Sequence, residues 1–445
     1  MFRFLYLLFQ FIILLIIASW AIRNSKLISF EFGDVIISTS SSVLIIGLLI
    51  IIIAALSFQR FIFFLKQSQQ KFKFYQNKKV FQRGHESFVK GMTALVNKDF
   101  KKAIVEANNT KKFLKDESLA LLLQSETLKI EKKFDQLNDV YEKMLKNQNM
   151  NTLGLRGLME QNLRNQDYHH AFVYGEKLFN LNPRIDKLYN TLINIIGKTN
   201  NWQKLIYLNE ESLKNRIINK NTYAENKSIA FYEIAKIKHK SLESESIELM
   251  EKAIRLKENF APYINFYIEL LLDSNKLEKA KKTLRKVWSV SPHPELKNQI
   301  KKLSIAMNIS YAELIKYITN KNTNSYESII LLTESFIEDE NWDKARSQIT
   351  SLLEHKPSRE VCLIMAKIEE NDGGDPQKIN AWVSRSNFGK LGKIWICQIT
   401  GSQQKNWSSV SKEGYFNTLY WKYPKNISEI GSTGFEINPI NYIQE

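Results

Sequence analysis

The sequence predicts an all-α protein: a two-helix transmembrane hairpin, then an α-solenoid of stacked helix pairs, then a small β-rich C-terminal tail. Two long apolar runs lie near the N-terminus. A pattern of apolar residues then recurs at a constant period through the middle of the chain. Glycine (16) and proline (8) are scarce for 445 residues, and long helices tolerate that scarcity better than a turn-rich β protein would.

Both apolar runs are long enough to cross a bilayer. Residues 4–22 carry no charge, and at about 1.5 Å per residue they nearly cross a hydrocarbon core of about 30 Å. The second run covers residues 43–65 if Arg60 extends its charge to the interface. A cleaved signal peptide is the alternative for the first run, because residues 19–21 form a faint cleavage-like triplet.

The flanking charges predict the orientation of this hairpin. The charges between the two runs sum to zero, whereas residues 59–90 hold eight lysines and arginines against Glu86 alone. Because basic segments stay on the cytoplasmic side, we expect both ends of the hairpin, and everything after it, in the cytoplasm. The basic stretch is expected to lie on anionic headgroups, or to be a charged linker helix.

The formal net charge of +17 has two possible sources. It is typical of proteins that bind nucleic acid or anionic membranes. The chain is also rich in Lys, Asn and Ile, a bias that AT-rich coding sequence produces. Since the local excess follows the second apolar run, we expect membrane lipid and no nucleic acid as a partner.

A 34-residue repeat occupies the middle of the chain. Each unit has an anchor residue, mostly aromatic or large and apolar, followed three positions later by Ala or another apolar residue. The anchors Phe100, Phe134, Tyr168 and Trp202 are spaced by 34 residues. After an insertion near residues 215–221 the register returns at a weaker position, Glu243, then 34 residues later at Leu277, and again at Trp342. Pro183, Pro292 and Pro357 stand fifteen residues after three anchors, where a helix must end. A constant 34-residue period is typical of tetratricopeptide repeat (TPR) helix pairs.

The repeat predicts the division of the chain. Residues 295–325 lack the pattern but are long enough for another helix pair, and residues 371–382 are expected to hold the turn of a last, incomplete pair. The predicted parts are a transmembrane hairpin at 1–65, a basic juxtamembrane helix or linker at 66–84, a TPR solenoid at 85–385 and a ribbon-like tail at 386–445.

His169 and His170 invite a metal or haem hypothesis that the repeat argues against. They lie between Tyr168 and Ala171, which must both point inward. Successive helical residues rotate by 100°, so the two histidines project outward. We therefore expect a solvated pair.

The sequence contains no recognisable catalytic constellation. It lacks a Gly-rich phosphate loop, a Gly-x-Ser-x-Gly elbow, a His-Glu-x-x-His motif and a dinucleotide fingerprint. Residues 372–375, Asp-Gly-Gly-Asp, are expected to form a turn, since they lack the ligand ladder of a calcium site. We predict no enzyme activity, no catalytic residue, no bound metal and no cofactor.

The first helices of TPR units form a concave surface, and two of them carry polar residues four positions apart. We predict a polar, mildly basic groove suited to peptide backbone or carboxylate groups. The alternative is a solvated face without a ligand. The candidate peptide-binding residues are Arg156, Glu160, Arg164, Asn190, Asn194 and Lys198.

The order of these parts resembles the HemY family of bacterial inner-membrane proteins. The more specific element is the loop Ser25–Val43, which is similar to the family's segment between the two spans. The resemblance implies a multi-pass inner-membrane protein with a cytoplasmic TPR domain. It also implies a scaffold or regulator associated with late haem (porphyrin) biosynthesis, whose partners are enzymes of that pathway.

The C-terminal tail resembles a ribbon seen in relatives, where two Cys-x-x-Cys-Gly knuckles flank a tryptophan. The four ligand positions here would be Cys397, Thr400, Val410 and Glu413. One thiol and one carboxylate cannot close a tetrahedral zinc site. We expect a small β-rich tail held by aromatic packing, and any function of relatives that depends on zinc is in doubt.

The leading functional hypothesis is a membrane-anchored, non-catalytic TPR scaffold that gathers or regulates enzymes of haem synthesis. The residues themselves predict a membrane-tethered adaptor, and the resemblance supplies the haem pathway. The alternatives are an inner-membrane adaptor for envelope or respiratory-complex assembly, and a protein that binds haem or porphyrin directly.

Overall fold

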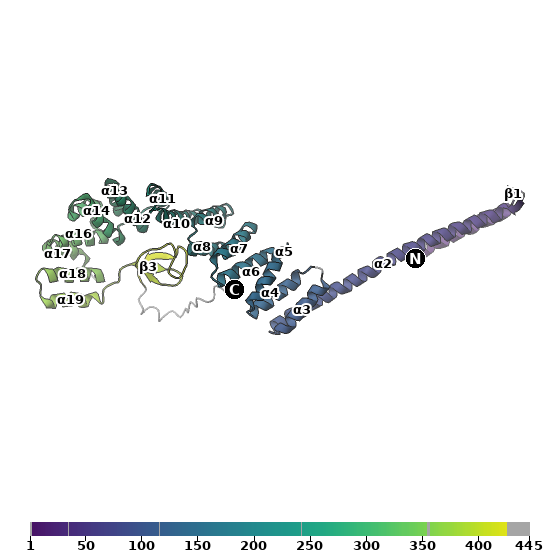
Figure 1. The fold of residues 1–445 in the computed structure, drawn as a ribbon, viewed down its shortest axis with the longest axis horizontal. Coiled ribbons are helices and arrows are strands. Elements are labelled where there is room, and N and C mark those ends of the chain that lie inside the picture. Colours follow the sequence, from purple (N-terminus) through teal and green to yellow (C-terminus); the bar gives the residue numbers. More distant parts are fainter. Residues whose placement is uncertain (1, 34, 115, 242, 354–356, 425–445) are drawn as a thin grey trace. The chain divides into compact units, whose positions relative to one another are not determined.

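The computed structural model describes residues 2–33, 35–114, 116–241, 243–353 and 357–424. The described chain is mostly helical (Figure 1). It divides into two compact units, residues 1–140 and 141–445. Each unit is described by itself below.

The first unit begins with two helices joined by a β-hairpin. Helix α1 (Phe2–Arg23) is followed by β1 (Leu27–Phe32) and β2 (Val35–Ser40), which pair antiparallel with Leu27 opposite Ser40. Gly33 lies in the connecting turn at φ +64°, a conformation that glycine adopts without a steric penalty. Helix α2 (Ser41–Val96) starts directly after β2 and contacts α1.

One helical segment of the described residues is long and apolar enough to cross a membrane. It is Ser41–Phe63 within α2, with a mean hydropathy of 2.8. This segment supports the second predicted span. The first predicted span lies within α1, and the two-span hairpin with its orientation stays a prediction.

Helix α2 continues without interruption for 56 residues, through the predicted span, the predicted linker and the first helix of the repeats. Its last turns carry a stripe of small residues, Gly84, Ser87, Gly91 and Ala94, all buried. A Cβ on Gly84 would stand 2.6 Å from the side chain of Leu114, so the missing side chain lets the next helix approach. Helices α3 (Phe100–Phe113) and α4 (Ser118–Ile130) contact α2, and α5 (Phe134–Lys146) follows.

The second unit is a row of helix pairs and confirms the repeat. The second helices of the pairs begin at predicted anchor residues: α7 (Tyr168–Leu181), α9 (Trp202–Lys214), α11 (Glu243–Leu256), α13 (Leu277–Val290) and α17 (Trp342–Ile349). The first helices are α6 (Asn151–Arg164), α8 (Leu188–Thr199), α10 (Lys220–Lys238), α12 (Ala261–Asp273) and α16 (Tyr326–Glu338). In the first unit, α3 and α5 begin at the anchors Phe100 and Phe134.

The region without the repeat pattern also forms a helix pair. It folds as a short 3₁₀ turn, η1 (Pro294–Leu296), with α14 (Lys297–Met307) and α15 (Tyr311–Thr319). After α17 and a second 3₁₀ turn, η2 (Thr350–Leu352), come α18 (Arg359–Asn371) and α19 (Pro376–Ser386). The last pair thus has two full helices joined by the Asp-Gly-Gly-Asp turn that the sequence predicts.

The turn inside most pairs follows one local rule. The residue two positions before the anchor has a left-handed backbone, with φ between 54° and 61° at Lys98, Lys132, Gln166, Asn200, Asn275 and Glu340. The next residue caps the second helix in several pairs; Asp167, for example, accepts a hydrogen bond from the backbone N–H of His170. Such a cap satisfies one of the N–H groups that a helix start leaves without a partner.

The C-terminal tail is a small sheet, as the sequence predicts. Strands β3 (Ile394–Cys397), β4 (Gln403–Gln404) and β5 (Leu419–Lys422) pair antiparallel in the order β4-β3-β5. Its aromatic and apolar side chains belong to the same buried cluster as those of helices α6 to α16. The tail is therefore part of the core of the second unit.

Candidate interaction surface on the inner helices

The candidate site is the inner face, defined as the surface that the first helices of the pairs present (α6, α8, α10, α12, α14, α16 and α18). The β tail lies against its middle part. Trp407 of the tail is only 8% exposed and lies between Tyr232 of α10, Phe260 at the N-cap of α12 and Tyr263 within α12. The ring centroids are 5.5, 5.1 and 5.7 Å from that of Trp407. Edge-to-face contacts at such distances stabilise beyond the area that they bury.

A second tryptophan fixes the tail to the 3₁₀ turn η1, directly before α14. The Trp395 side chain is 3% exposed, and its Nε1–H donates a hydrogen bond to Oε1 of Glu295. Burial raises the pKa of the Glu295 carboxyl, and this hydrogen bond partly offsets the rise. The ring centroids of His293 and Trp421 lie 4.5 Å apart, with the two rings tilted by 48°. Burial of His293, with the charge of Lys393 adding to the effect, lowers its pKa to about 4. His293 is therefore neutral at pH 7.

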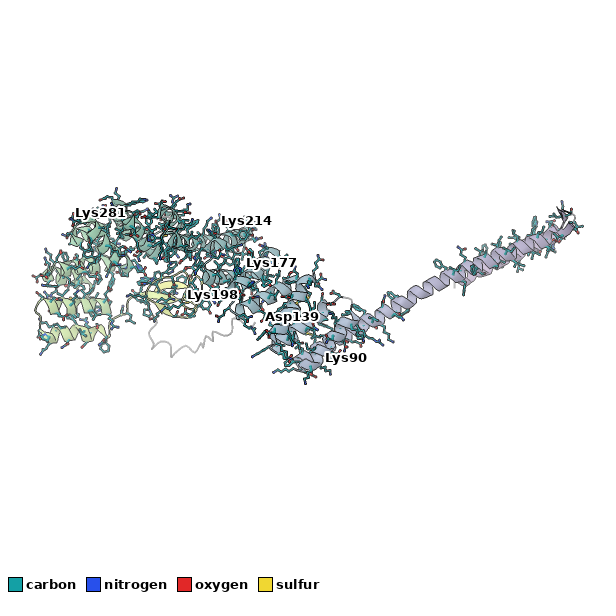
Figure 2. The ribbon with its side chains drawn as sticks, in the orientation of Figure 1. Lys90, Asp139, Lys177, Lys198, Lys214 and Lys281 are labelled. Atoms are coloured by element: carbon teal, nitrogen blue, oxygen red, sulfur yellow. The ribbon has the colours of Figure 1, made fainter. Side chains whose placement is uncertain are left out.

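The tail also contacts two of the predicted peptide-binding residues. The backbone N–H of Phe416 donates a hydrogen bond to Oδ1 of Asn194 over 3.0 Å. Lys198, labelled beside the tail in Figure 2, lies against Gly414 and places its Nζ 4.7 Å from the ring centre of Tyr168. Asn194 and Lys198 thus contact this chain's own tail.

The other four candidate residues lie elsewhere on the inner face. Nε of Arg156 is 2.9 Å from Oε1 of Glu160 along α6, and both side chains are partly exposed. Arg164 and Asn190 are exposed. The structure therefore does not gather the six residues around one site, and their peptide-binding role stays a prediction.

An open part of the inner face lies further along, where α14, α16 and α18 face each other. A pocket of about 360 Å³ is lined there by side chains of both charges and by Ile337 and Ile364. Its other lining residues are Lys297, Asn298, Lys301, Tyr311, Glu334, Glu338 and Lys367. The combination of cations, carboxylates and apolar carbon suits a polar peptide segment.

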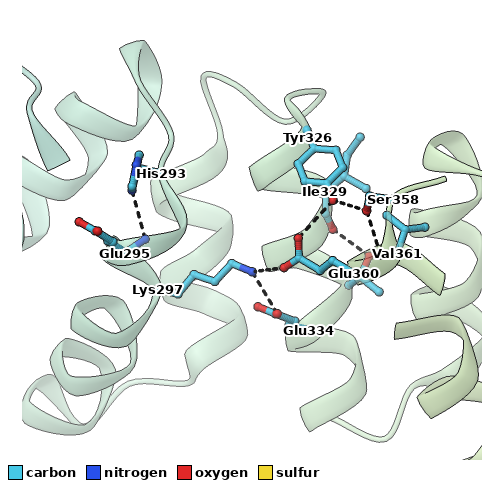
Figure 3. A network of polar contacts seen from close by, with 10 residues as sticks. His293, Glu295, Lys297, Tyr326, Ile329, Glu334, Ser358, Glu360 and Val361 are labelled. Atoms are coloured by element: carbon cyan, nitrogen blue, oxygen red, sulfur yellow. Dashed lines mark hydrogen bonds and ion pairs between the residues drawn. The ribbon is translucent and has the colours of Figure 1, made fainter. Parts of the chain in front are cut away.

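Ion pairs cross this pocket from one helix to the next (Figure 3). Nζ of Lys297 lies 3.1 Å from Glu334 on α16 and 3.4 Å from Glu360 on α18. Burial works against the charge of Lys297, but the two carboxylates outweigh it and raise its pKa. Lys301 pairs with Glu338 over 2.6 Å nearer to solvent. Lys297 therefore joins three consecutive helix pairs through charge.

Glu327 is the unusual ionisable group of this region. Burial raises its pKa to about 7, although the charge of Lys297 opposes the rise. Its Oε2 is buried without a hydrogen-bond partner. Near neutral pH this carboxyl therefore changes between its neutral and charged forms, close to the pocket.

The tail positions that correspond to zinc ligands in the resembling ribbons make ordinary protein contacts in this structure. Gly401 and Gly414 have left-handed backbones, with φ of 73° and 87°. The thiol of Cys397 donates a hydrogen bond to Oγ1 of Thr418 over 3.3 Å. Among the described residues, no three His, Cys, Asp or Glu side chains come together as metal ligands.

The paired histidines lie where the sequence places them. His169 and His170 are both exposed at the first turn of α7. Nδ1 of His170 lies 2.7 Å from Oδ2 of Asp167, the residue that caps the helix. The hydrogen bonds from His170 lower the pKa of this carboxyl. His170 thus holds the capping residue Asp167 at the N-terminus of α7.

Comparison with known proteins finds a family match for the N-terminal part of the chain. The family model described as "HemY protein N-terminus" matches residues 27–131, which cover the β-hairpin, α2 and the first helices after it. This region is similar to the N-terminal part of HemY-family proteins. The match confirms the family resemblance and spans the candidate membrane segment together with the first repeats. Among curated proteins, no sequence matches the chain.

Solved structures that resemble this chain include the following three. A chain of the Naa15/Naa10 complex bound to HypK-THB is 13% identical over 70% of this chain, with a TM-score of 0.39. This chain spans 54% of its length. The TPR2AB domain of yeast Sti1 in its pHSP90 complex is 10% identical, with 68% of this chain and 98% of that one covered and a TM-score of 0.29. A tetratricopeptide repeat protein from Parabacteroides merdae is 11% identical, with 56% and 98% covered and a TM-score of 0.26.

Proposed function

We propose that this HemY protein is a membrane-anchored, non-catalytic TPR scaffold that gathers or regulates enzymes of late haem synthesis. The match of residues 27–131 to the HemY N-terminus carries the proposal. Helix α2 supplies the anchor through Ser41–Phe63, and the helix pairs supply the surface. We further propose two spans in the bacterial inner membrane, with both termini and the solenoid in the cytoplasm.

The pocket between α14, α16 and α18 is the proposed partner site. The β tail fills the middle of the inner face, whereas Lys301 and Glu338 remain half-exposed, at 55% and 42% of their side chains. A partner segment with its own charges competes with such a pair at little cost, because exposed ion pairs contribute only about 0–1 kcal/mol. The exposed Arg156, Arg164 and Asn190, with the partly exposed Glu160, extend the proposed surface toward α6 and α8.

Co-purification tests the proposal. The full chain is extracted in mild detergent, and the associated proteins are compared between wild type, Lys301→Glu and the matched control Lys252→Glu. Lys252 forms a similar pair with Glu248, but on the second helix α11. We expect haem-pathway enzymes with wild type and control, and at least a tenfold loss with Lys301→Glu.

Two results would reject parts of this proposal. If haem-pathway enzymes are absent and envelope or respiratory-complex factors are enriched, the pathway assignment is wrong. If the Soret band of haem shifts and sharpens on titration with the full chain, relative to free haem, direct binding replaces scaffolding as the connection to haem. Comparison with the His169→Ala, His170→Ala double variant then shows whether these two histidines are ligands.

A further inference from the structure

We propose that residues 74–83 of α2 form a stalk that binds an acidic amphipathic helix of a partner protein. This stalk is distinct from the pocket on the inner face. The inference rests on the anchored arrangement given under the proposed function.

The stalk is the part of α2 between the candidate span and the first repeats. Residues 41–96 contain no proline, and no glycine occurs between Gly47 and Gly84, so nothing in the sequence breaks the helix there. Gly84 is the first buried residue of α2 after this segment, and a Cβ there would meet the side chains of Leu114 and Phe113. Every side chain from 74 to 83 is exposed within the structure described.

Exposed aromatic residues make this segment unusual. Phe74, Tyr75 and Phe81 are 67%, 68% and 63% exposed, and Val80 is 41% exposed. Phe74 and Phe81 lie seven residues apart and therefore share one side of the helix, with Tyr75 beside Phe74. Large apolar groups that stay in water on one helix side mark a surface that a partner covers.

The bilayer does not reach these residues when Ser41–Phe63 spans it. At about 1.5 Å per residue, Phe74 lies roughly 16 Å and Phe81 roughly 27 Å beyond Phe63 along the axis. The headgroup layer is only about 5–8 Å thick on each side. Even a tilt of about 40° leaves Phe81 roughly 20 Å from the hydrocarbon edge. Lipid headgroups therefore reach the basic residues next to the span, and the aromatic residues need another partner.

The positive charge of the segment favours a partner with acidic side chains. Residues 64–85 contain six lysines or arginines and no aspartate or glutamate. A second copy of the stalk would place two such basic segments side by side, and like charges at close range repel. An amphipathic helix with an apolar stripe and flanking Asp or Glu residues matches both the aromatic side and the cations Lys78, Lys79 and Arg83.

A designed peptide tests the proposal on the full chain in phosphatidylcholine nanodiscs. The probe is a labelled helix of three heptads with leucine on one side and glutamate beside it. The control probe carries lysine instead of glutamate. By fluorescence anisotropy, we expect the acidic probe to bind, with at least tenfold weaker binding to the Phe74→Ser, Phe81→Ser double variant and at high salt. Val105→Ser, which changes an exposed residue of α3, should bind like wild type. Equal binding of the two probes, or an unaffected double variant, would overturn the proposal.

Two further measurements test whether the bilayer or a second copy of the chain covers the stalk instead of a partner helix. A fluorophore at position 81, attached through Phe81→Cys, should not be quenched by brominated phosphatidylglycerol; quenching would make the bilayer the occupant. The same variant should not form an intermolecular disulfide; a dimer would make a second copy the occupant. Neither measurement uses haem enzymes, so a failed co-purification leaves the stalk proposal standing, and the reverse also holds.

Discussion

Tyr189 on α8 joins three helices through its hydroxyl group. The hydroxyl donates a hydrogen bond to Oδ1 of Asn209 on α9 over 2.9 Å and accepts one from Nδ2 of Asn226 on α10 over 2.7 Å. Burial raises the pKa of Tyr189 to about 12, so the group stays neutral and keeps its proton for donation. Neighbouring helix pairs are thus fixed in register by polar contacts as well as by apolar packing.

Replacing this tyrosine should therefore destabilise the second unit. Tyr189→Phe keeps the ring but leaves the buried Asn226 amide and Asn209 carbonyl oxygen without a partner. We expect a loss of about 1–3 kcal/mol in the free energy of unfolding. Urea denaturation followed by circular dichroism measures it. Tyr207→Phe on α9, where the side chain is 44% exposed, is the control and should match wild type.

Glu327 gives the protein a pH dependence that can be isolated. Its folded-state pKa of about 7 lies above the ordinary value of 4.5. Between these values the folded chain holds a proton that the unfolded chain releases, so this group's contribution to stability falls as the pH rises from 4.5 to 7. Glu327→Gln removes the titration and should be more stable than wild type at pH 8, by on the order of 1–3 kcal/mol.

The measurement is urea unfolding of wild type and Glu327→Gln at pH 5, 6, 7 and 8. The difference between the two proteins should be small at pH 5 and should grow up to pH 8. Other groups titrate equally in both proteins, so the comparison cancels them. Two parallel profiles would show that Glu327 has an ordinary pKa.

Among the elements, the tight turns inside the pairs combine a steric cost with a capping gain. Glu340 has a left-handed backbone at φ 54°, and Asn341 then caps α17 by accepting a hydrogen bond from the backbone N–H of Lys344. A side chain in this conformation costs roughly 1–2 kcal/mol, which glycine avoids. The turn is therefore a place where the natural residue is not the most stable one.

We expect Glu340→Gly to raise the free energy of unfolding by up to about 1 kcal/mol, because glycine's larger entropy in the unfolded chain offsets part of the gain. Asp343→Gly is the matched control. It lies three residues further on, inside α17, and should lower stability by about 0.5–1 kcal/mol. Thermal unfolding of both variants, with opposite shifts in Tm, checks the prediction.

The tail is the second informative element. Trp407→Ala removes a buried ring from between Tyr232, Phe260 and Tyr263, and such truncations cost about 3–5 kcal/mol. We expect that loss together with detachment of the tail, seen as new protease cleavage between residues 390 and 424. Phe388→Ala, at a side chain that is 92% exposed, should change neither.

The sequence predicts the helices of this fold better than it predicts its surfaces. The anchors Phe100, Tyr168 and Trp202 begin helices because periodicity and helix starts are local properties of the chain. The partner of Asn194 is not local, since Phe416 lies 222 residues further along. A spacing of four along one helix therefore identified a polar face but not the tail that covers part of it.

The pocket between α14 and α18 shows the same limit. Lys297 and Glu360 are 63 residues apart, and the segment that contains Lys297 lacks the repeat's anchor pattern. One local signal existed: Lys297 with Lys301, and Glu334 with Glu338, each stand four apart, as residues on one helix side do. That the two sides face each other follows only from the stacking of the pairs.

For the whole molecule, anchoring decides which compartment the helix pairs occupy. With two spans, the chain crosses the membrane twice, and the solenoid lies on the same side as the N-terminus. With Ser41–Phe63 disabled, a chain that keeps the first span crosses once, and the solenoid lies on the opposite side. The side of the membrane on which the solenoid lies after Ser41–Phe63 is damaged therefore shows whether the chain has one span or two.

Ile51→Asp with Ile53→Asp places two charges near the centre of Ser41–Phe63, where each costs about 2.5–3.5 kcal/mol on insertion scales. We expect this variant to stay in the membrane fraction and to place its C-terminus in the periplasm. A C-terminal alkaline phosphatase fusion should then become active, and a C-terminal green fluorescent protein fusion should lose its fluorescence. Val105→Asp, outside the span, should keep the wild-type pattern. Release of the variant into the soluble fraction would show that residues 4–22 do not anchor the chain, because a second span would have retained it.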